Sequence, residues 1–131
     1  MLFKNIVLID DDQIFNFIHH KVIEQINNSI PIITFQSSQT ALTFFETKEK
    51  NDNANEKTLV FLDINMPFLN GFELIEKVME QNCSTEHLVF YVVSSTLNEK
   101  EIERATAYEL VKGFYSKPLT AQIITEILTA E

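Results

Sequence analysis

Short runs of apolar residues alternate with longer segments in which apolar residues recur every three or four positions. The short runs cover residues 5–9, 31–35, 58–62 and 88–93, and a fifth centres on Phe114 and Tyr115. Each run is brief and rich in β-branched or aromatic side chains, which favours buried strands over helices. The pattern therefore predicts five strands.

The segments between the strands carry helical stripes. Residues spaced by three and four positions lie on one face of a helix. The stripes are Ile14, Phe15, Ile18, Val22, Ile23 and Ile26; Ala41, Leu42, Phe44 and Phe45; Phe72, Leu74, Ile75, Val78 and Met79; Ile102, Ala105 and Leu110; and Ile123, Ile124, Ile127 and Leu128. Asp12, Ser37 or Ser38, and Thr120 are placed to cap helices. The fourth helix, expected over about residues 98–110, is weakly amphipathic.

The order of the elements is (βα)₅, and residues 1–131 form one expected domain. Apolar strands that alternate with helices predict a doubly wound α/β fold, a parallel sheet covered by helices on both faces. Residues 48–57 are polar and show no periodicity, so we expect an exposed loop there.

Polar side chains gather where the strands end. They are Asp10, Asp11 and Asp12 after the first strand, Asp63 after the third, Ser94, Ser95 and Thr96 after the fourth, and Lys117 with Pro118 after the fifth. Binding sites of parallel α/β sheets lie beyond the carboxyl ends of the strands. If these four strands are neighbours, their polar residues converge on one pocket.

The chemistry of this set points to a metal-assisted reaction of a phosphoryl group. Oxygen ligands favour Mg²⁺, Mn²⁺ or Ca²⁺ over zinc. A carboxylate beside Mg²⁺ can attack phosphorus and form an acyl phosphate, while a lysine and a hydroxyl stabilise the transferred charge. Taken singly, an acid placed like Asp63 is more often a turn cap than a nucleophile, and Lys117 would be a surface lysine. Asp10 and Asp11 alone could equally form a solvated turn.

The stretches IVLIDDD, FLDINMPFLNGFEL, VVSS and GFYSKPLT together resemble the receiver domain of two-component response regulators, over essentially the whole chain. The resemblance implies a flavodoxin-like fold with strand order 2-1-3-4-5. It implies that Asp63 is the phosphoacceptor and that Asp10 and Asp11 form the acidic pair. Asp11 and Asp63 would bind Mg²⁺ directly, Asp10 through a water, and Asn65 through its backbone carbonyl.

The resemblance also assigns the remaining positions. Ser94 would be the switch hydroxyl, and Lys117 would pair with the phosphoryl group, its bond to Pro118 being commonly cis in the family. The family's usual number of residues between the switch hydroxyl and the lysine fits Ser95, whereas Ser94 directly ends the apolar strand. Ser94 is therefore preferred, and Ser95 stays open as an alternative. Phe114 occupies the switch position where tyrosine is common, and it lacks the hydroxyl.

A receiver domain takes its phosphoryl group from a phosphohistidine on a sensor histidine kinase or a histidine phosphotransfer domain. The resemblance implies a phosphoprotein of a phosphorelay that is not a turnover enzyme, apart from its own phosphorylation and slow autodephosphorylation. Phosphorylation would shift a two-state equilibrium on the face made by the fourth helix, fifth strand and fifth helix. Because the sequence stops at Glu131, just after the fifth predicted helix, we expect no output domain and a signal passed to a protein target.

Composition narrows the alternatives. The net charge of −9 argues against nucleic acid and anionic membranes as partners. Cys83 is the single cysteine, the N-terminus is unlike a signal peptide, and no run approaches the roughly 18 apolar residues of a membrane span, so a cytoplasmic location is expected. A haloacid-dehalogenase-type phosphohydrolase would need a second Asp where Asn65 stands. A flavodoxin-like cofactor carrier would need a phosphate-binding loop where three acids stand.

Overall fold

The computed structural model describes residues 2–47, 56–81 and 85–130. Its strands form one parallel sheet in the order β2-β1-β3-β4-β5. The strands are β1 (Leu2–Ile9), β2 (Ile32–Phe35), β3 (Glu56–Leu62), β4 (Leu88–Ser94) and β5 (Val111–Ser116). The predicted fold class and strand order are confirmed.

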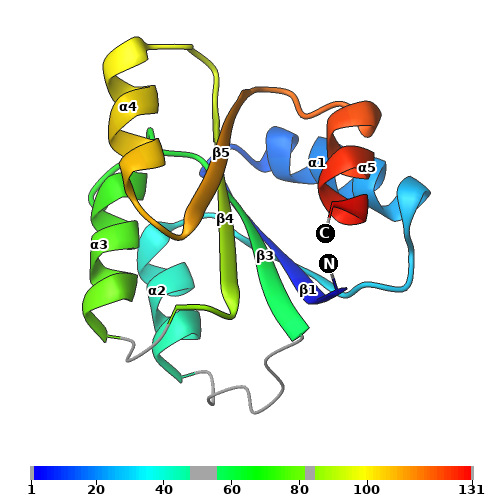
Figure 1. Ribbon diagram of the computed structural model, residues 1–131, viewed down its shortest axis with the longest axis horizontal. Helices are drawn as coiled ribbons and strands as arrows, with labels where there is room; N and C mark the ends of the chain where they lie inside the picture. The colour runs from blue at the N-terminus through cyan, green and yellow to red at the C-terminus, as the bar shows by residue number, and fades with distance from the viewer. Residues whose placement is uncertain (1, 48–55, 82–84, 131) are drawn as a thin grey trace.

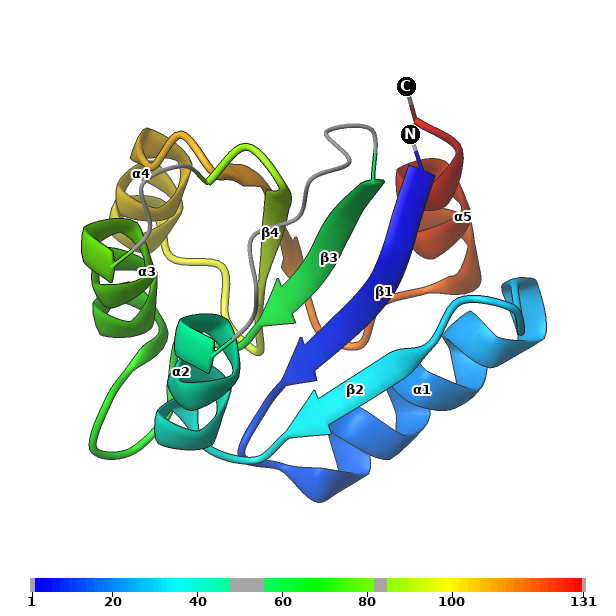
Figure 2. The same ribbon diagram turned by 90° about the horizontal axis from the view of Figure 1, so that it is seen from below.

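Five helices cover the two faces of the sheet. They are α1 (Gln13–Ile26), α2 (Ser38–Thr47), α3 (Gly71–Gln81), α4 (Glu99–Ala107) and α5 (Ala121–Thr129). Helices α2, α3 and α4 lie on one face, and α1 and α5 lie on the other (Figures 1 and 2). This arrangement leaves the carboxyl ends of the strands as an edge that the loops alone enclose.

Each face of the sheet has its own core, because successive side chains of a strand point to opposite faces. Val7, Val60 and Val92 pack beneath α2, α3 and α4. Leu8 and Phe61, their neighbours in sequence, pack beneath α1 and α5. Burial on both faces explains why the central strands are continuously apolar in the sequence.

The predicted helix caps are present. The Asp12 carboxylate accepts the backbone N–H of Ile14 at 2.9 Å, and the Thr120 hydroxyl accepts that of Ile123 at 3.2 Å. The hydroxyl of Ser37 accepts the N–H of Thr40 at 3.2 Å, so Ser37, rather than Ser38, caps α2. These caps fix where α1, α2 and α5 begin, directly after the strand ends.

Several predicted boundaries were wrong. Strand β1 begins at Leu2, three residues before the predicted start. The fourth helix ends at Ala107, and Leu110 lies outside it as a buried residue just before β5. Strand β5 is longer than expected, since Val111 already begins it. Strand β3 begins at Glu56, so the end of the predicted loop is strand; residues 48–55 of that loop, like Cys83, lie outside the described residues. The first two residues of β3 pair with β1 alone, which leaves them half-buried and lets them be polar.

Among the described residues, no helix has both the length and the apolar character needed to cross a membrane.

Candidate functional site

Backbone hydrogen bonds continue past the strand ends and fix the residues that follow them. The N–H of Asp10 donates to the carbonyl of Phe35 at 3.1 Å, and the N–H of Asp63 donates to that of Ile9 at 3.0 Å. The N–H of Lys117 donates to the carbonyl of Ser94 at 2.8 Å. The sheet therefore brings the predicted residues of β1, β3, β4 and β5 to one place.

Three carboxylates meet at this edge. Asp10, Asp11 and Asp63 each offer an oxygen, and these oxygens lie within 4.8 Å of one another. Asp10 and Asp63 are both 4% exposed, whereas Asp11 is exposed to solvent. An all-oxygen set that is open to water on one side suits a hard divalent cation such as Mg²⁺. The residues could therefore hold a metal ion.

Lys117 lies among these carboxylates. Its ammonium nitrogen is 2.6 Å from Oδ2 of Asp10 and 3.3 Å from Oδ2 of Asp63, and its side chain is 6% exposed. The same nitrogen lies 4.6 Å from the ring centre of Phe15, a cation–π contact. Burial alone lowers the pKa of Lys117, but the bonds and charges of Asp10 and Asp63 outweigh it and raise the pKa.

Asp63 is held in an environment that disfavours its charge. Burial, with a smaller contribution from the charge of Asp10, raises its pKa from 3.8 to about 6. The N–H of Asn65, which donates to Oδ1 of Asp63 at 3.1 Å, and the nearby Lys117 act in the opposite direction. A carboxylate that is poorly solvated by water is more available to bind a cation or to react.

The two candidate serines occupy different environments. Ser94 is fully buried, and its hydroxyl accepts the N–H of Thr96 at 3.3 Å and the side-chain amide of Asn65 at 3.5 Å. Ser95 is exposed. The hydroxyl of Ser94 thus lies beside the loop that follows Asp63.

Phe114 lies in β5, and Pro118 lies in the loop between β5 and α5. Phe114 pairs with Val92 in the sheet and packs, half-buried, against the core beneath α4. Its side chain lies on the face of the sheet that α4 covers. The bond between Lys117 and Pro118 is cis, as the resemblance implied.

Two residues of α1 support the site, and sequence reasoning missed the roles of both. The side-chain amide of Asn16 donates to the backbone carbonyl of Asp10 at 2.9 Å. Nε2 of His19 accepts the backbone N–H of Leu119 at 3.0 Å, and burial lowers the pKa of this imidazole. Their spacing from Ile23, the third buried residue of α1, was the available signal. His20, the next residue of α1, is half-exposed, and its Nε2 lies 3.5 Å from Oε2 of Glu24.

Comparison with known proteins places this geometry in a family. The model of the response regulator receiver domain matches residues 6–129. Response regulator Rcp1 from Synechocystis sp. is 22% identical over 112 residues, which cover 86% of this chain and 74% of that protein.

Solved structures share the fold. A two-component response regulator from Cytophaga hutchinsonii is 27% identical with a TM-score of 0.78, over 96% of this chain and 93% of that chain. A response regulator receiver protein from Dyadobacter fermentans is 24% identical with a TM-score of 0.79, over 95% and 94% of the two chains. The family match spans nearly all of the residues that build the sheet and its acidic edge. The chain therefore belongs to the response regulator receiver domain family of two-component signalling proteins.

Proposed function

We propose that the chain accepts a phosphoryl group on Asp63 from the phosphohistidine of a sensor histidine kinase or a histidine phosphotransfer domain, with Mg²⁺ bound. The observation that carries this proposal is the buried Asp63 carboxylate, which shares the ammonium of a buried lysine with a second buried carboxylate, that of Asp10. Membership of a family of signalling proteins supports it. The phosphorylated chain then acts through contacts with a protein target.

The metal site of this proposal uses oxygen atoms alone. Asp11 and Asp63 would bind Mg²⁺ directly, and Asp10 and the backbone carbonyl of Asn65 would complete the site, as the resemblance implies. The close approach of the three carboxylates and the exposure of Asp11 support this assignment. When bound, Mg²⁺ neutralises charge on the phosphoryl oxygens and on the acids.

The chain's own residues carry the transfer. An oxygen of Asp63 attacks phosphorus, the bond between phosphorus and the histidine nitrogen breaks, and its electron pair leaves with the imidazole. Lys117, which is already 3.3 Å from Asp63, turns its ammonium toward the new phosphoryl oxygens. The Ser94 hydroxyl, buried beside the Asn65 loop, donates a hydrogen bond to the same group.

The change at Ser94 reaches the surface through β5. Ser94 pairs with Ser116, and Val92 pairs with Phe114. A shift of the end of β4 would therefore displace the ring of Phe114, which packs beneath α4. We assign Phe114 as the switch residue and the surface of α4, β5 and α5 as the surface that a target binds. Water slowly hydrolyses the aspartyl phosphate, so the chain has no rapid turnover of its own.

Incubation with acetyl phosphate and Mg²⁺, followed by intact mass measurement, tests the proposal. The wild-type chain gains one phosphoryl group, Asp63→Asn gains none, and a chelator abolishes the reaction. Asp12→Asn, which alters the exposed helix cap that directly follows Asp11 in the chain, serves as the matched control and reacts normally. Phosphorylation of the Asp63→Asn protein at this site, or rapid multiple turnover of small phosphate esters, would contradict the proposal.

A second measurement follows the switch. Beryllofluoride with Mg²⁺ imitates the phosphoryl group on a carboxylate, and it is expected to shift the amide resonances of Ser94 and Phe114. The same addition leaves the resonances of the Asp63→Asn protein unchanged. Unshifted resonances in the wild-type protein would show that the acceptor and Phe114 are not coupled.

A further inference from the structure

The imidazole of His19, in α1, contacts the loop between β5 and α5 that carries Lys117. His19 is 4% exposed, and its Nε2 accepts the backbone N–H of Leu119 at 3.0 Å. The two residues are 100 positions apart in the chain. This bond therefore links α1 to the β5–α5 loop directly, and not through the sheet.

The bond to His19 is one of two that fix the backbone around Lys117. On the N-terminal side, the N–H of Lys117 itself donates to the carbonyl of Ser94 at 2.8 Å. On the C-terminal side, Pro118 has no N–H, so the N–H of Leu119 is the first backbone hydrogen-bond donor after Lys117. His19 accepts this donor. The lysine thus extends from a loop anchored immediately before and after it.

The same helix contacts the other end of the Lys117 side chain. The ring of Phe15 lies 4.6 Å below the ammonium nitrogen, and the ring of His19 lies 5.9 Å from that of Phe15. Asn16 donates to the carbonyl of Asp10, the acid nearest to the ammonium. The buried side of α1 therefore supports both partners of the ion pair between Lys117 and Asp10.

We propose that His19 is a positioning residue, which holds the Lys117 loop so that the ammonium stays between Asp10 and Asp63. The inference rests on the proposed function, because placing the ammonium matters for transfer to Asp63. Without the acceptor, the buried N–H of Leu119 loses its partner, and the loop shifts to recover one. A small displacement of a catalytic group is enough to slow a reaction strongly.

Two substitutions separate the acceptor from the volume of the imidazole. His19→Leu fills the space and removes the acceptor, whereas His19→Gln keeps an acceptor of similar reach. With acetyl phosphate and Mg²⁺, His19→Leu is expected to lower the phosphorylation rate about tenfold, and His19→Gln to stay within about threefold of the wild type. His20→Leu, one position along on the outer side of α1, is the matched control and changes nothing. A His19→Leu rate within twofold of the wild type overturns the inference.

A double-mutant cycle separates positioning from a general weakening of the fold. If His19 acts through Lys117, then His19→Leu causes no further loss of rate in a Lys117→Ala background. The same fold-loss in both backgrounds would show that His19 does not act through the lysine. Urea unfolding of each variant reports stability, so that the rates are compared between variants that are shown to be folded under the assay conditions.

The geometry is also testable without phosphorylation. Because Nε2 accepts a hydrogen bond, the neutral imidazole of His19 carries its proton on Nδ1, and ¹⁵N NMR distinguishes the two tautomers. A proton found on Nε2 would overturn the inference even if no His19 variant folds. The side-chain resonances of Lys117 are expected to shift in His19→Leu and not in His19→Gln, and unshifted resonances also overturn it. Absence of phosphorylation in the wild type would instead refute the proposed function and leave these NMR results standing.

Discussion

The ammonium nitrogen of Lys117 lies nearer to Asp10 than to Asp63, at 2.6 Å against 3.3 Å. The lysine is thus held mainly by Asp10, which is not the proposed phosphoacceptor. Asp63 has a longer contact with the ammonium, and this contact offsets less of the cost of burying the Asp63 charge. Because Asp10 holds Lys117 in place, the carboxylate of Asp63 can exchange its contact with the lysine for a contact with another group.

Lys117→Met is expected to destabilise the folded chain at neutral pH. It keeps most of the side-chain volume but leaves Asp10 and Asp63 as two buried carboxylates without their cation. Removing one member of a buried ion pair costs about 3–5 kcal/mol. Urea unfolding should show a loss of this order at pH 7 and a smaller loss near pH 4.5, where Asp63, with a pKa of about 6, is protonated. Lys100→Met, at an exposed position, is the control, and an equal loss at both pH values would contradict the explanation.

The pKa of Asp63 predicts a pH dependence of stability when no divalent cation is present. The folded chain binds the proton with a pKa of about 6, against 3.8 as the ordinary value, so the folded state gains protons that the unfolded state does not. The free energy of unfolding therefore falls as the pH rises from about 4 to about 6. Lys117 does not titrate in this window, since its pKa is raised from an already high 10.5.

Asp63→Asn removes this dependence, because the amide cannot ionise. Above pH 6.5 we expect the variant to be more stable than the wild type by on the order of 1–3 kcal/mol without a divalent cation. Thermal unfolding at pH 5 and pH 7.5, with and without Mg²⁺, measures the effect. Added Mg²⁺ should narrow the difference by stabilising the wild type. A wild type that is more stable at pH 7.5 than the variant, without a cation, would show that the charge of Asp63 is well compensated.

Gly71 is predicted to tolerate no side chain. A Cβ atom there would lie 2.6 Å from Cα of Ile64 and 2.9 Å from the carbonyl oxygen of Asp63, both backbone atoms. Gly71→Ala must therefore push the chain away from the acceptor, with an expected loss of about 2 kcal/mol or more in unfolding free energy. Gly113→Ala is the matched control, because its nearest neighbour, 3.0 Å away, belongs to the movable ring of Tyr91. Equal losses at the two positions would refute the backbone argument.

Phe68 is expected to be strained. Its φ of 69° is left-handed, and the N–H of Leu69 donates to the carbonyl of Pro67 at 2.8 Å. The residue is 93% exposed. Asparagine adopts this backbone conformation more readily, so Phe68→Asn should raise the free energy of unfolding by about 1 kcal/mol. Phe17→Asn, an exposed position within α1, should give no gain. A loss of stability in Phe68→Asn would mean that the ring makes contacts that outweigh the strain.

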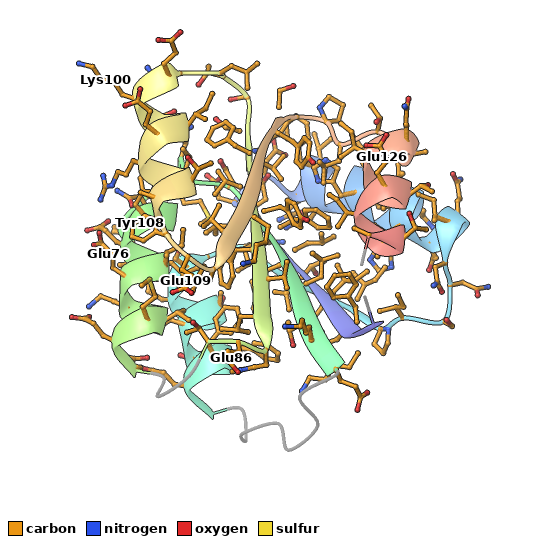
Figure 3. All side chains as sticks on the ribbon, in the orientation of Figure 1. Glu76, Glu86, Lys100, Tyr108, Glu109 and Glu126 are labelled. Carbon is orange, nitrogen blue, oxygen red and sulfur yellow. The ribbon has the colours of Figure 1, made fainter. Side chains whose placement is uncertain are left out.

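Tyr108 is predicted to set the pKa of Glu76. The two residues lie beside one another between α4 and α3, and the Tyr108 hydroxyl donates to the Glu76 carboxylate at 2.5 Å (Figure 3). This hydrogen bond, with a smaller contribution from Arg104, holds the pKa of Glu76 below its ordinary value. Tyr108→Phe should move the pKa of Glu76 back toward that value in an NMR titration of its carboxyl carbon. Tyr115→Phe, on the other face of the sheet, is the control and leaves it unchanged.

Much of the site could be predicted from the sequence because parallel strands carry their ends to one edge. Asp63 directly follows the apolar β3, and the sheet fixes its backbone through Ile9. The start of β5 could not be predicted in this way. The ring of Tyr91 occupies the space that a side chain at position 113 would fill, so this strand position is a glycine. The residue before it, Lys112, is exposed and polar, and together the two residues hide the strand pattern.

The pairing of Lys117 and the role of His19 also escaped prediction, for a different reason. The resemblance implied that Lys117 pairs with the phosphoryl group, and it said nothing of the 2.6 Å contact with Asp10. The contact of His19 joins residues 100 positions apart, and no local pattern contains both. Such contacts depend on how α1 packs against the β5–α5 loop, which periodicity alone does not define.

The charges collected at the carboxyl edge have a consequence for the switch. Three carboxylates and one ammonium leave two negative charges when all are ionised, which is the charge that one divalent cation cancels. The edge would therefore be electrically neutral with a cation bound. The proposed phosphorylation would replace the single charge of Asp63 by the nearly doubled charge of a phosphoryl group. The resulting imbalance of about one negative charge, buried under the loops, would draw polar hydrogens toward it, and the hydroxyl of Ser94 is the buried donor that β4 places beside it.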